Sequence, residues 1–212
     1  MPLGKFITLE GMEGAGKSTN LAYLCSMLDA QGLVYTVTRE PGGTPLAEEI
    51  RRLLLAPREE KMVPLCELLL VFAARAQHIE AVILPALKRG EWVISDRFTD
   101  ATFAYQGAGR ELGTARVNEL EQFVQGELRP DLTLFLDVPL DIGMQRVAKR
   151  GELDRFEREQ SEFFQRVRAA YLARIEADPE RFIHIDASRE LSIVQSEIAK
   201  AAGELMKNTK QA

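Results

Sequence analysis

The stretch that decides the fold is Gly11-Met12-Glu13-Gly14-Ala15-Gly16-Lys17-Ser18. It matches the pattern G-x-x-x-x-G-K-[ST] in full. A buried apolar run (Lys5 to Glu10) precedes it and an amphipathic helical repeat follows it. Glycines allow backbone torsions that turn several N–H groups inward, and the start of the following helix adds its dipole. The stretch therefore predicts a phosphate-binding loop at the end of a strand.

Two side chains of this loop suit a bound triphosphate. Lys17 can reach the β- and γ-phosphates, and the Ser18 hydroxyl can ligate Mg²⁺. The residues that we expect to bind a nucleoside triphosphate are Gly11, Met12, Glu13, Gly14, Ala15, Gly16, Lys17, Ser18 and Thr19. A chance glycine-rich turn is the plain alternative, but the strand and helix around the motif favour a phosphate loop.

Short apolar runs alternate with helical periodicities along the chain. Five runs have the length and composition of buried parallel strands: Phe6-Ile7-Thr8-Leu9, Leu33 to Val37, Trp92-Val93-Ile94, Leu132 to Val138 and Phe182 to Ile185. Their alternation with helices predicts an α/β protein with a three-layer P-loop NTPase fold, in which helices flank a five-stranded parallel sheet. We expect one domain over residues 1–212, with ligands beyond the carboxyl ends of the strands.

The composition is that of an ordinary globular protein, with 46% hydrophobic and 28% charged residues. No apolar run approaches the ~18 residues of a membrane span, and the first residues lack the apolar core of a signal peptide. We therefore expect a cytoplasmic protein without a membrane partner. A net charge of −5 argues against a nucleic-acid-binding surface. Cys25 and Cys66 fall in helical patterns, which favours two reduced thiols.

A phosphate loop alone leaves two classes of protein open: a phosphotransferase, or a GTPase switch or ATP-driven module. A GTPase would carry an Asn-Lys-x-Asp motif, which this sequence lacks. Its Asp-x-x-Gly, Asp29 to Gly32, ends the first predicted helix, where it cannot sense a γ-phosphate. Large ATPases need a further module, for which 212 residues leave little room. A small kinase is favoured.

Polar residues beyond the other strands are candidates for binding an acceptor. Arg39 ends the second strand, where it could bind a phosphate or remain a surface residue. Phe72 lies on the apolar stripe of a helix, and Arg75, one turn later, points the same way. Together they could hold a planar base by stacking and hydrogen bonding, although core packing is the default interpretation for Phe72.

Ser95-Asp96-Arg97 follows the third predicted strand. A carboxylate at the end of an apolar strand beside a phosphate loop is the expected partner of Mg²⁺, and Arg97 can bind a phosphate. Asp137 ends the fourth strand and competes for the carboxylate role. We favour Asp96, because a phosphate-binding arginine adjoins it whereas Asp137 is followed by Val-Pro.

Over essentially its whole length the sequence resembles the bacterial type of thymidylate kinase, within the P-loop nucleoside monophosphate kinases. The resemblance rests on the phosphate loop and on four further motifs: Thr-Arg-Glu-Pro-Gly-Gly-Thr, Phe-Ala-Ala-Arg-Ala-Gln, Asp-Arg-Phe with Ala-Tyr-Gln-Gly, and Arg-Gly-Glu-Leu-Asp-Arg. Any P-loop protein could share the loop, whereas the others in this order are specific to thymidylate kinases. The resemblance implies that the γ-phosphoryl group of ATP is transferred to dTMP, giving dTDP and ADP for dTTP synthesis.

The resemblance also implies how the base and the acceptor phosphate are bound. Phe72 is expected to stack on thymine, and Arg75 to hydrogen-bond the base. Arg39 and Arg97 are expected to bind the phosphate of dTMP.

Other matching positions are implied to contact the sugar and the base. Glu13 takes the place of the family acid that contacts the 3′ end of the sugar. Tyr105 is expected to crowd the 2′ position and so favour deoxyribose, with Thr102 and Gln106 near the base. A packed helix residue is the plain alternative for Tyr105.

One position departs from the pattern of the eukaryotic-type relatives, which carry an arginine where this chain has Gly14. In the bacterial type a lid supplies that positive charge, and here the lid is expected near residues 146–157 with a hinge at Gly151. The cations available are Arg146, Lys149, Arg150, Arg155 and Arg158. Arg150 and Arg155 are our candidates for catalysis, although a solvated charged face is a rival interpretation for any single residue.

We expect direct in-line transfer without a covalent enzyme intermediate. A phosphate monoester has a second pKa of about 6 and is mostly dianionic at pH 7, so no general base is required. Catalysis is then positioning plus charge neutralisation by Mg²⁺, Lys17, Arg97 and lid arginines. The resemblance further implies a homodimer, whose interface the apolar helices around residues 64–87 could supply.

Overall fold

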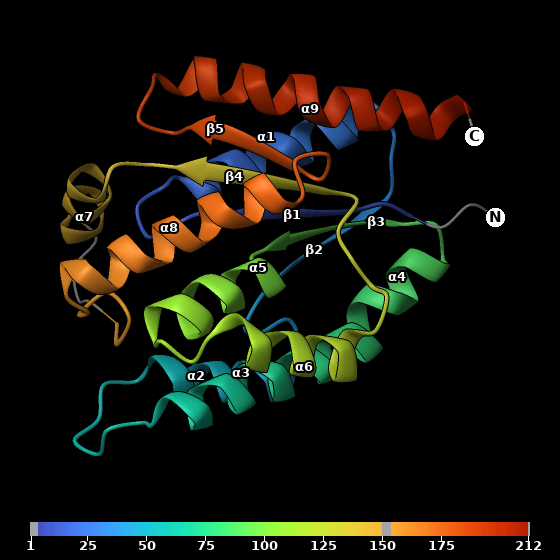
Figure 1. Ribbon diagram of the computed structural model, residues 1–212. Coiled ribbons are helices and arrows are strands. Elements are labelled where there is room, and N and C mark those ends of the chain that lie inside the picture. Colours follow the sequence, from blue (N-terminus) through green and yellow to red (C-terminus); the bar gives the residue numbers. More distant parts are fainter. Residues whose placement is uncertain (1–3, 150–153, 212) are drawn as a thin grey trace.

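The structure is a computed structural model that describes residues 4–149 and 154–211 (Figure 1). Its strands are β1 (Phe6–Glu10), β2 (Tyr35–Arg39), β3 (Trp92–Asp96), β4 (Leu132–Asp137) and β5 (Phe182–Asp186). Its helices are α1 (Lys17–Ala30), α2 (Pro45–Leu55), α3 (Pro64–His78), α4 (Leu84–Lys88), α5 (Thr99–Thr102), α6 (Thr114–Gln125), α7 (Leu140–Ala148), α8 (Ser161–Ala177) and α9 (Leu191–Gln211). Two π-helical segments are η1 (Ile79–Ile83) and η2 (Phe103–Gly109).

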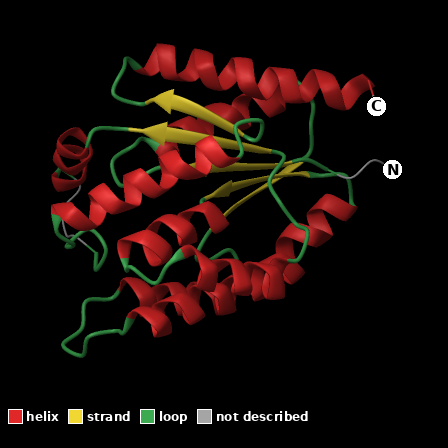
Figure 2. Ribbon diagram, in the orientation of Figure 1, coloured by secondary structure: helices red, strands yellow, loops and turns green. Residues whose placement is uncertain are grey.

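The five strands form one parallel sheet in the order β2-β3-β1-β4-β5 (Figure 2). The five-stranded parallel sheet predicted from the sequence is therefore confirmed. The second strand begins at Tyr35 rather than Leu33, and it continues to Arg39. Register places Asp96 of β3 opposite Leu9 of β1 and Arg39 of β2. The loops that follow β1, β2 and β3 therefore meet at one edge of the sheet.

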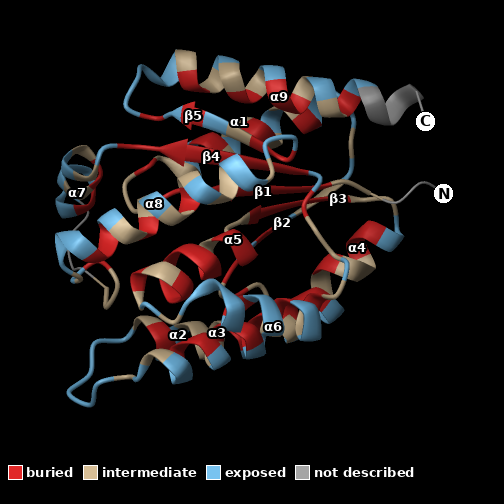
Figure 3. Cartoon of the chain, in the orientation of Figure 1, coloured by how far each residue is buried: buried red, intermediate tan, exposed pale blue. Residues whose placement is uncertain are grey.

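Helices cover both faces of this sheet, as Figures 1 and 3 show. Successive side chains of a strand point to opposite faces, so a strand buried on both sides is apolar throughout. On one face Ile7 packs in a core cluster with Leu24 of α1 and Ile198 of α9. On the other face Phe6 packs in a cluster with Ile83. The central strands are buried accordingly.

The segments α3, η1 and α4 run together as one helical stretch, Pro64–Lys88. By length and composition alone this stretch is apolar enough to cross a membrane. Of its most apolar 18-residue segment, 44% is buried inside the protein. Its charged residues interrupt the apolar run, so a span of that length did not stand out in the sequence. Ile83 lies in the core, and Glu67 and Arg75 are buried in ion pairs. The inner side of the stretch thus belongs to the protein core.

Candidate active site

A cavity of about 450 Å³ opens at the carboxyl edge of the sheet. That volume is usual for a small-molecule site. Residues from the loop after β1, the ends of β2 and β3, α2, α3, η2 and the segment 154–157 line it. The predicted site residues among them are Glu13, Gly14, Ala15, Gly16, Lys17, Ser18, Thr19, Arg75, Asp96, Arg97, Thr102, Tyr105 and Gln106. The fold therefore brings most of the predicted site together.

The loop after β1 has the shape expected of a phosphate loop. Gly14 and Gly16 have φ angles of 75° and 84°, in the left-handed region that favours glycine. The Lys17 ammonium at the start of α1 donates to the carbonyl oxygens of Gly11 and Met12, at 3.0 and 3.3 Å. Burial lowers the pKa of Lys17, and its side chain lines the cavity. A lysine and a helix N-terminus thus face the same space, as anion binding requires.

The phosphate loop touches α7 backbone to backbone. A Cβ on Gly14 would lie 2.2 Å from the carbonyl oxygen of Gly143, and a Cβ on Gly143 would lie 2.7 Å from that of Glu13. Contacts this short with backbone atoms leave no room for a side chain. The approach of α7 is a steric reason for glycine at position 14 of this chain.

Arg97, directly after β3, contacts two other residues that line the cavity. Its Nη2 donates to a Glu13 carboxylate oxygen at 2.9 Å and to the Tyr105 hydroxyl at 3.1 Å. Its guanidinium carbon lies 4.7 Å from the centre of the Tyr105 ring. Three residues predicted separately, from the phosphate loop, the end of β3 and η2, therefore form one contact group.

Arg75 is buried beside the cavity with one nitrogen left over. Its Nε donates to Glu40 at 2.8 Å and its Nη2 donates to the Thr102 hydroxyl at 2.8 Å. His78 Nδ1 lies 2.9 Å from the second carboxylate oxygen of Glu40. Nη1 of Arg75 has no hydrogen-bond partner within the described parts of the chain. A buried unpaired donor at a cavity wall is costly unless a ligand accepts its hydrogen bond.

The aromatic ring predicted to face the base lies elsewhere. Phe72 is packed in a core cluster with Leu68, Phe103 and Val117, while Val71 lines the cavity. Val71 precedes Arg75 by four residues, and this spacing also places two side chains on one helix face. Both positions are apolar, so the pattern could not separate them. Phe98 is also next to the cavity, but its ring is fully buried in the cluster with Phe6 and Ile83, so Val71 supplies the apolar contact from this helix.

Of two arginines near α2, the main cavity is lined by Arg51 and not by Arg39, which the sequence analysis had predicted to bind a phosphate. Arg39 forms a bidentate ion pair with Glu48 at 3.1 and 2.8 Å, is half-exposed, and lines a neighbouring hollow. Arg51, which the sequence analysis did not single out, lines the main cavity and donates to the Pro41 carbonyl at 2.9 Å. Burial lowers the pKa of Arg51, and the positive charges of Arg39 and Arg97 lower it further. That positive field makes the cavity attractive to an anion.

The two candidate carboxylates also differ in their contacts. Asp137 is held by Arg168, at 2.8 and 2.7 Å, and by His184 at 3.0 Å. Asp96 has one buried oxygen without a partner in the described ranges, and it lines the cavity with Ser18. Residues 4–149 and 154–211 contain no group of three or more His, Cys, Asp or Glu side chains that could hold a metal. Asp96 and Ser18 are therefore the better-placed pair.

The sequence analysis predicted that two lid arginines, Arg150 and Arg155, take part in catalysis. Arg150 lies outside the described residues. Arg155 is held by α2 and α3, since its Nε donates to the Leu54 carbonyl at 2.6 Å and its Nη1 pairs with buried Glu67 at 2.7 Å. Arg146 of α7 contacts the phosphate loop instead, because its Nη1 donates to the Gly14 carbonyl at 3.1 Å. Arg155 thus faces away from the phosphate loop in this structure.

A phosphate loop after the central strand of a five-stranded parallel sheet, beside a cavity that several arginines line, is the architecture of a P-loop kinase of the nucleoside monophosphate class. The family model described as thymidylate kinase matches residues 9–198. The chain is 61% identical over 203 residues to a thymidylate kinase of Pseudomonas syringae pv. tomato, covering 96% of this chain and 97% of that protein. It is 58% identical over 207 residues to one of Pseudomonas fluorescens Pf-5, covering 98% and 99%. The chain belongs to the thymidylate kinase family.

Proposed function

We propose that this chain transfers the γ-phosphoryl group of ATP to dTMP and releases dTDP and ADP. Its family consists of enzymes that phosphorylate dTMP to dTDP. The observation that carries the proposal is that cations from separate segments line one cavity. Lys17 lies in the phosphate loop, Arg51 on α2 and Arg97 directly after β3. This arrangement suits a donor triphosphate and an acceptor monophosphate side by side.

Transfer then needs positioning rather than a protein nucleophile. The loop N–H groups and Lys17 hold the β- and γ-phosphates, while Arg97 and Arg51 hold the phosphate of dTMP. An oxygen of that dianionic phosphate attacks the γ-phosphorus in line, the bond to the β-phosphate oxygen breaks, and ADP leaves. The positive charges of Lys17, Arg51 and Arg97 stabilise the negative charge that develops on the transferring phosphoryl group. No proton needs to be removed from the acceptor.

The base and sugar fit the remaining walls. Nη1 of Arg75, which has no partner among the described residues, can donate to a carbonyl oxygen of thymine, and Val71 offers an apolar surface to the ring. Thr102 and Gln106 line the same part of the cavity. In this assignment Phe72 supports Arg75 from behind, with the guanidinium carbon 4.8 Å from its ring centre.

Tyr105 and Glu13 are assigned to the sugar. The Tyr105 ring is almost fully buried and its hydroxyl is hydrogen-bonded to Glu13. A ring fixed in this way can exclude a 2′-hydroxyl, while Glu13 lies within the phosphate loop near the point of transfer. These assignments give the site its preference for deoxyribose.

We assign Mg²⁺ to Ser18 and Asp96. Mg²⁺ in nucleotide enzymes is usually held by one or two protein oxygens together with substrate phosphates, and it neutralises charge on the triphosphate when bound. The Asp96 oxygen that has no partner in residues 4–149 and 154–211 suits this role. Chelation by EDTA should stop turnover, and Asp96→Asn should raise the Mg²⁺ concentration needed for half-maximal rate. An unchanged Mg²⁺ requirement in that variant would remove Asp96 from the assignment.

We further propose a cytoplasmic homodimer that uses the outward side of α3 and the adjacent α6. Apolar side chains stand exposed there: Val63, Leu65, Leu69 and Phe123. Light scattering on the purified chain should give twice the mass of 23.8 kDa. Leu69→Glu should shift that mass to the monomer value, and a mass insensitive to this change would place the interface elsewhere.

The direct test of the activity is product analysis. The protein is incubated with ATP, Mg²⁺ and dTMP, and the nucleotides are separated by ion-exchange chromatography. The proposal predicts dTDP and ADP in equal amounts. ADP without dTDP would indicate an ATPase and would contradict it.

A further inference from the structure

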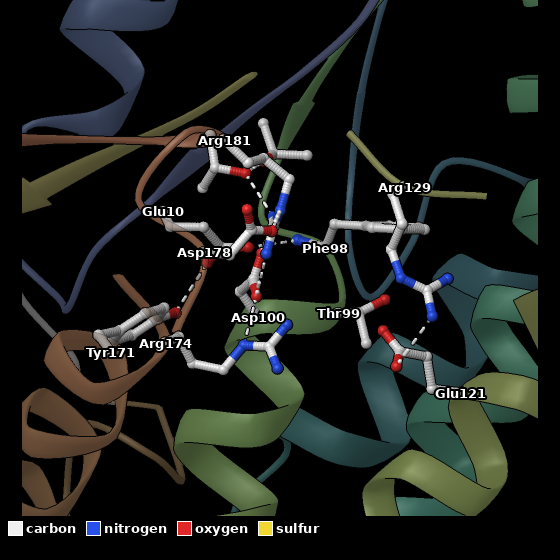
Figure 4. Close-up of polar contacts among 12 residues, drawn as sticks. Glu10, Phe98, Thr99, Asp100, Glu121, Arg129, Tyr171, Arg174, Asp178 and Arg181 are labelled. Carbon is white, nitrogen blue, oxygen red and sulfur yellow. Dashed lines mark hydrogen bonds and ion pairs between the residues drawn. The ribbon is translucent and has the colours of Figure 1, made fainter. Parts of the chain in front are cut away.

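Glu10 is a fully buried carboxyl group to which the mechanism above gives no task. It is the last residue of β1 and directly precedes the phosphate loop. Strand alternation places it on the side of the sheet that faces α5 and α8 (Figure 4). A buried carboxylate is unfavourable unless hydrogen bonds compensate for the lost water. Its partners therefore indicate why it is there.

The first partner is the backbone that follows Arg97. The Phe98 N–H donates to one Glu10 oxygen at 2.7 Å (Figure 4). Arg97 itself has a φ of 71°, a left-handed conformation that is unfavourable for a side chain of this size. Such a conformation persists only when its surroundings hold it. The Arg97 N–H donates to Leu9 O at 2.9 Å, and the Ser95 hydroxyl donates to Arg97 O at 2.7 Å. Together with these two hydrogen bonds, the bond from Phe98 N–H to Glu10 holds the backbone of Arg97 in this conformation.

The second partner is a hydroxyl that contacts the Arg97 side chain. Tyr171 of α8 donates to the other Glu10 oxygen at 2.7 Å (Figure 4). The same hydroxyl oxygen accepts a longer hydrogen bond, 3.4 Å, from Nη1 of Arg97. A phenol has one proton to donate, so a carboxylate acceptor leaves the hydroxyl oxygen available to the guanidinium. The chain of donors runs from Arg97 through Tyr171 to Glu10.

Opposing effects act on the pKa of the Glu10 carboxyl group. The charged and titratable groups that face it come from four different segments: Lys17, Arg97, Asp100 and Tyr171. Asp100 is itself paired with Arg174 and Arg181, each at 2.7 Å. Burial, and then the negative charge of Asp100, raise the pKa of Glu10 to about 7, against the opposing effect of Arg97.

We infer that Glu10 is a positioning residue for Arg97, which it holds through the Phe98 backbone and through the Tyr171 hydroxyl. Glu10 touches no substrate in this account; it sets where the guanidinium stands when the acceptor phosphate arrives. The inference rests on the proposed function, in which Arg97 binds that phosphate. Misplacement of such a group by about 1 Å can lower a rate ~100-fold.

A double-mutant cycle tests this inference with Glu10→Gln, Arg97→Ala and the combination. Glutamine keeps the size of the side chain and an oxygen for the Phe98 N–H, but it removes the charge that orients Tyr171. At about pH 8.5, where the parent Glu10 is ionised, we expect Glu10→Gln to lower kcat/KM for dTMP at least ~10-fold while the KM for ATP stays within ~2-fold. In the Arg97→Ala background the same change should cost less than ~2-fold, because its target is gone.

Glu121→Gln is the matched control. Glu121 is also a buried carboxylate, and it is paired with Arg129 at 3.1 Å. Figure 4 shows that this ion pair shares no residue with the contacts of Glu10. Its substitution should leave kcat/KM for dTMP within ~2-fold of the parent. A loss from Glu10→Gln of equal size in both Arg97 backgrounds, or no loss in the parent, overturns the inference.

A second variant covers failure to fold. If Glu10→Gln yields no folded protein, Tyr171→Phe removes only the relaying hydroxyl and enters the same cycle with the same expected non-additivity. The parent enzyme is assayed first. A parent that makes no dTDP contradicts the proposed function, whereas an active parent with unaffected Glu10 and Tyr171 variants overturns this inference alone.

Discussion

The Tyr105 hydroxyl lies 2.8 and 2.7 Å from the two carboxylate oxygens of Glu13 and so joins the acceptor side of the cavity to the phosphate loop. Burial raises the pKa of Tyr105 well above its usual range, so its hydroxyl stays protonated and donates. The Arg97 guanidinium covers the same ring. Donor-side and acceptor-side groups are thus held in one network before any substrate contact is considered.

This network predicts that the Tyr105 ring excludes ribonucleotides. Tyr105→Ala removes the ring, so the preference in kcat/KM for dTMP over ribothymidine monophosphate should fall at least ~10-fold. Tyr105→Phe keeps the ring and loses only the hydroxyl, so it should keep most of the preference. An unchanged ratio in the alanine variant would return Tyr105 to a packing role.

Lys17 is predicted to supply charge to the reaction rather than support to the core. Lys17→Ala should lower kcat at least ~100-fold, because a preorganised cation is lost at the transferring phosphoryl group. Thermal unfolding should move by no more than a few degrees. Lys88→Ala, at an exposed position on α4, is the control and should change neither quantity. Near-parent turnover of Lys17→Ala would contradict the phosphate-loop assignment.

Arg51 and Arg39 are predicted to differ in their effect on the acceptor. Arg51 lines the main cavity, so Arg51→Ala should raise the KM for dTMP at least ~10-fold through loss of a charge-assisted contact. Arg39 is paired with Glu48 at 2.8 Å, and Arg39→Ala should change that KM by less than ~3-fold. Steady-state kinetics with dTMP as the varied substrate decide between them. The reverse order would assign the acceptor phosphate to Arg39.

The contact between the phosphate loop and α7 predicts a position-specific cost. Gly14 and Gly32 both have positive φ, at 75° and 65°, but a Cβ has open space at Gly32 and meets Gly143 O at 2.2 Å from Gly14. Both alanine variants should lose about 1 kcal/mol for the backbone conformation, and Gly14→Ala a further ~1–3 kcal/mol for overpacking. Urea unfolding measures both. Equal losses would mean that α7 yields without cost.

The fold was readable from the sequence because its signals are local. Each strand is a short apolar run, and the phosphate loop carries its own glycines, lysine and helix start. The same holds for residues next to strand ends, such as Asp96 and Arg97, since parallel strands bring their carboxyl ends to one edge.

The remainder of the site depends on contacts between distant segments. Val71 and Phe72 are both apolar neighbours, and only packing decides which of them faces the cavity. Long arginine side chains reach several partners, so neither the pairing of Arg39 with Glu48 nor that of Arg155 with Glu67 could be predicted. The position of Arg51 in the cavity wall also depends on such a contact, because α2 packs beside the loop that follows β2.

The most direct test of the account is a coupled ADP-release assay across dTMP, dUMP, dCMP, dGMP and dAMP. Nη1 of buried Arg75, which has no partner in the described part of the chain, can donate to a carbonyl of thymine but would meet an amino group at the corresponding position of cytosine. A site built to pair with one hydrogen-bond pattern rejects the mismatched one strongly. The account predicts the highest kcat/KM for dTMP, with dCMP and the purine nucleotides lower by at least ~100-fold. Equal rates for all five acceptors, or ADP release that needs no acceptor, would contradict it.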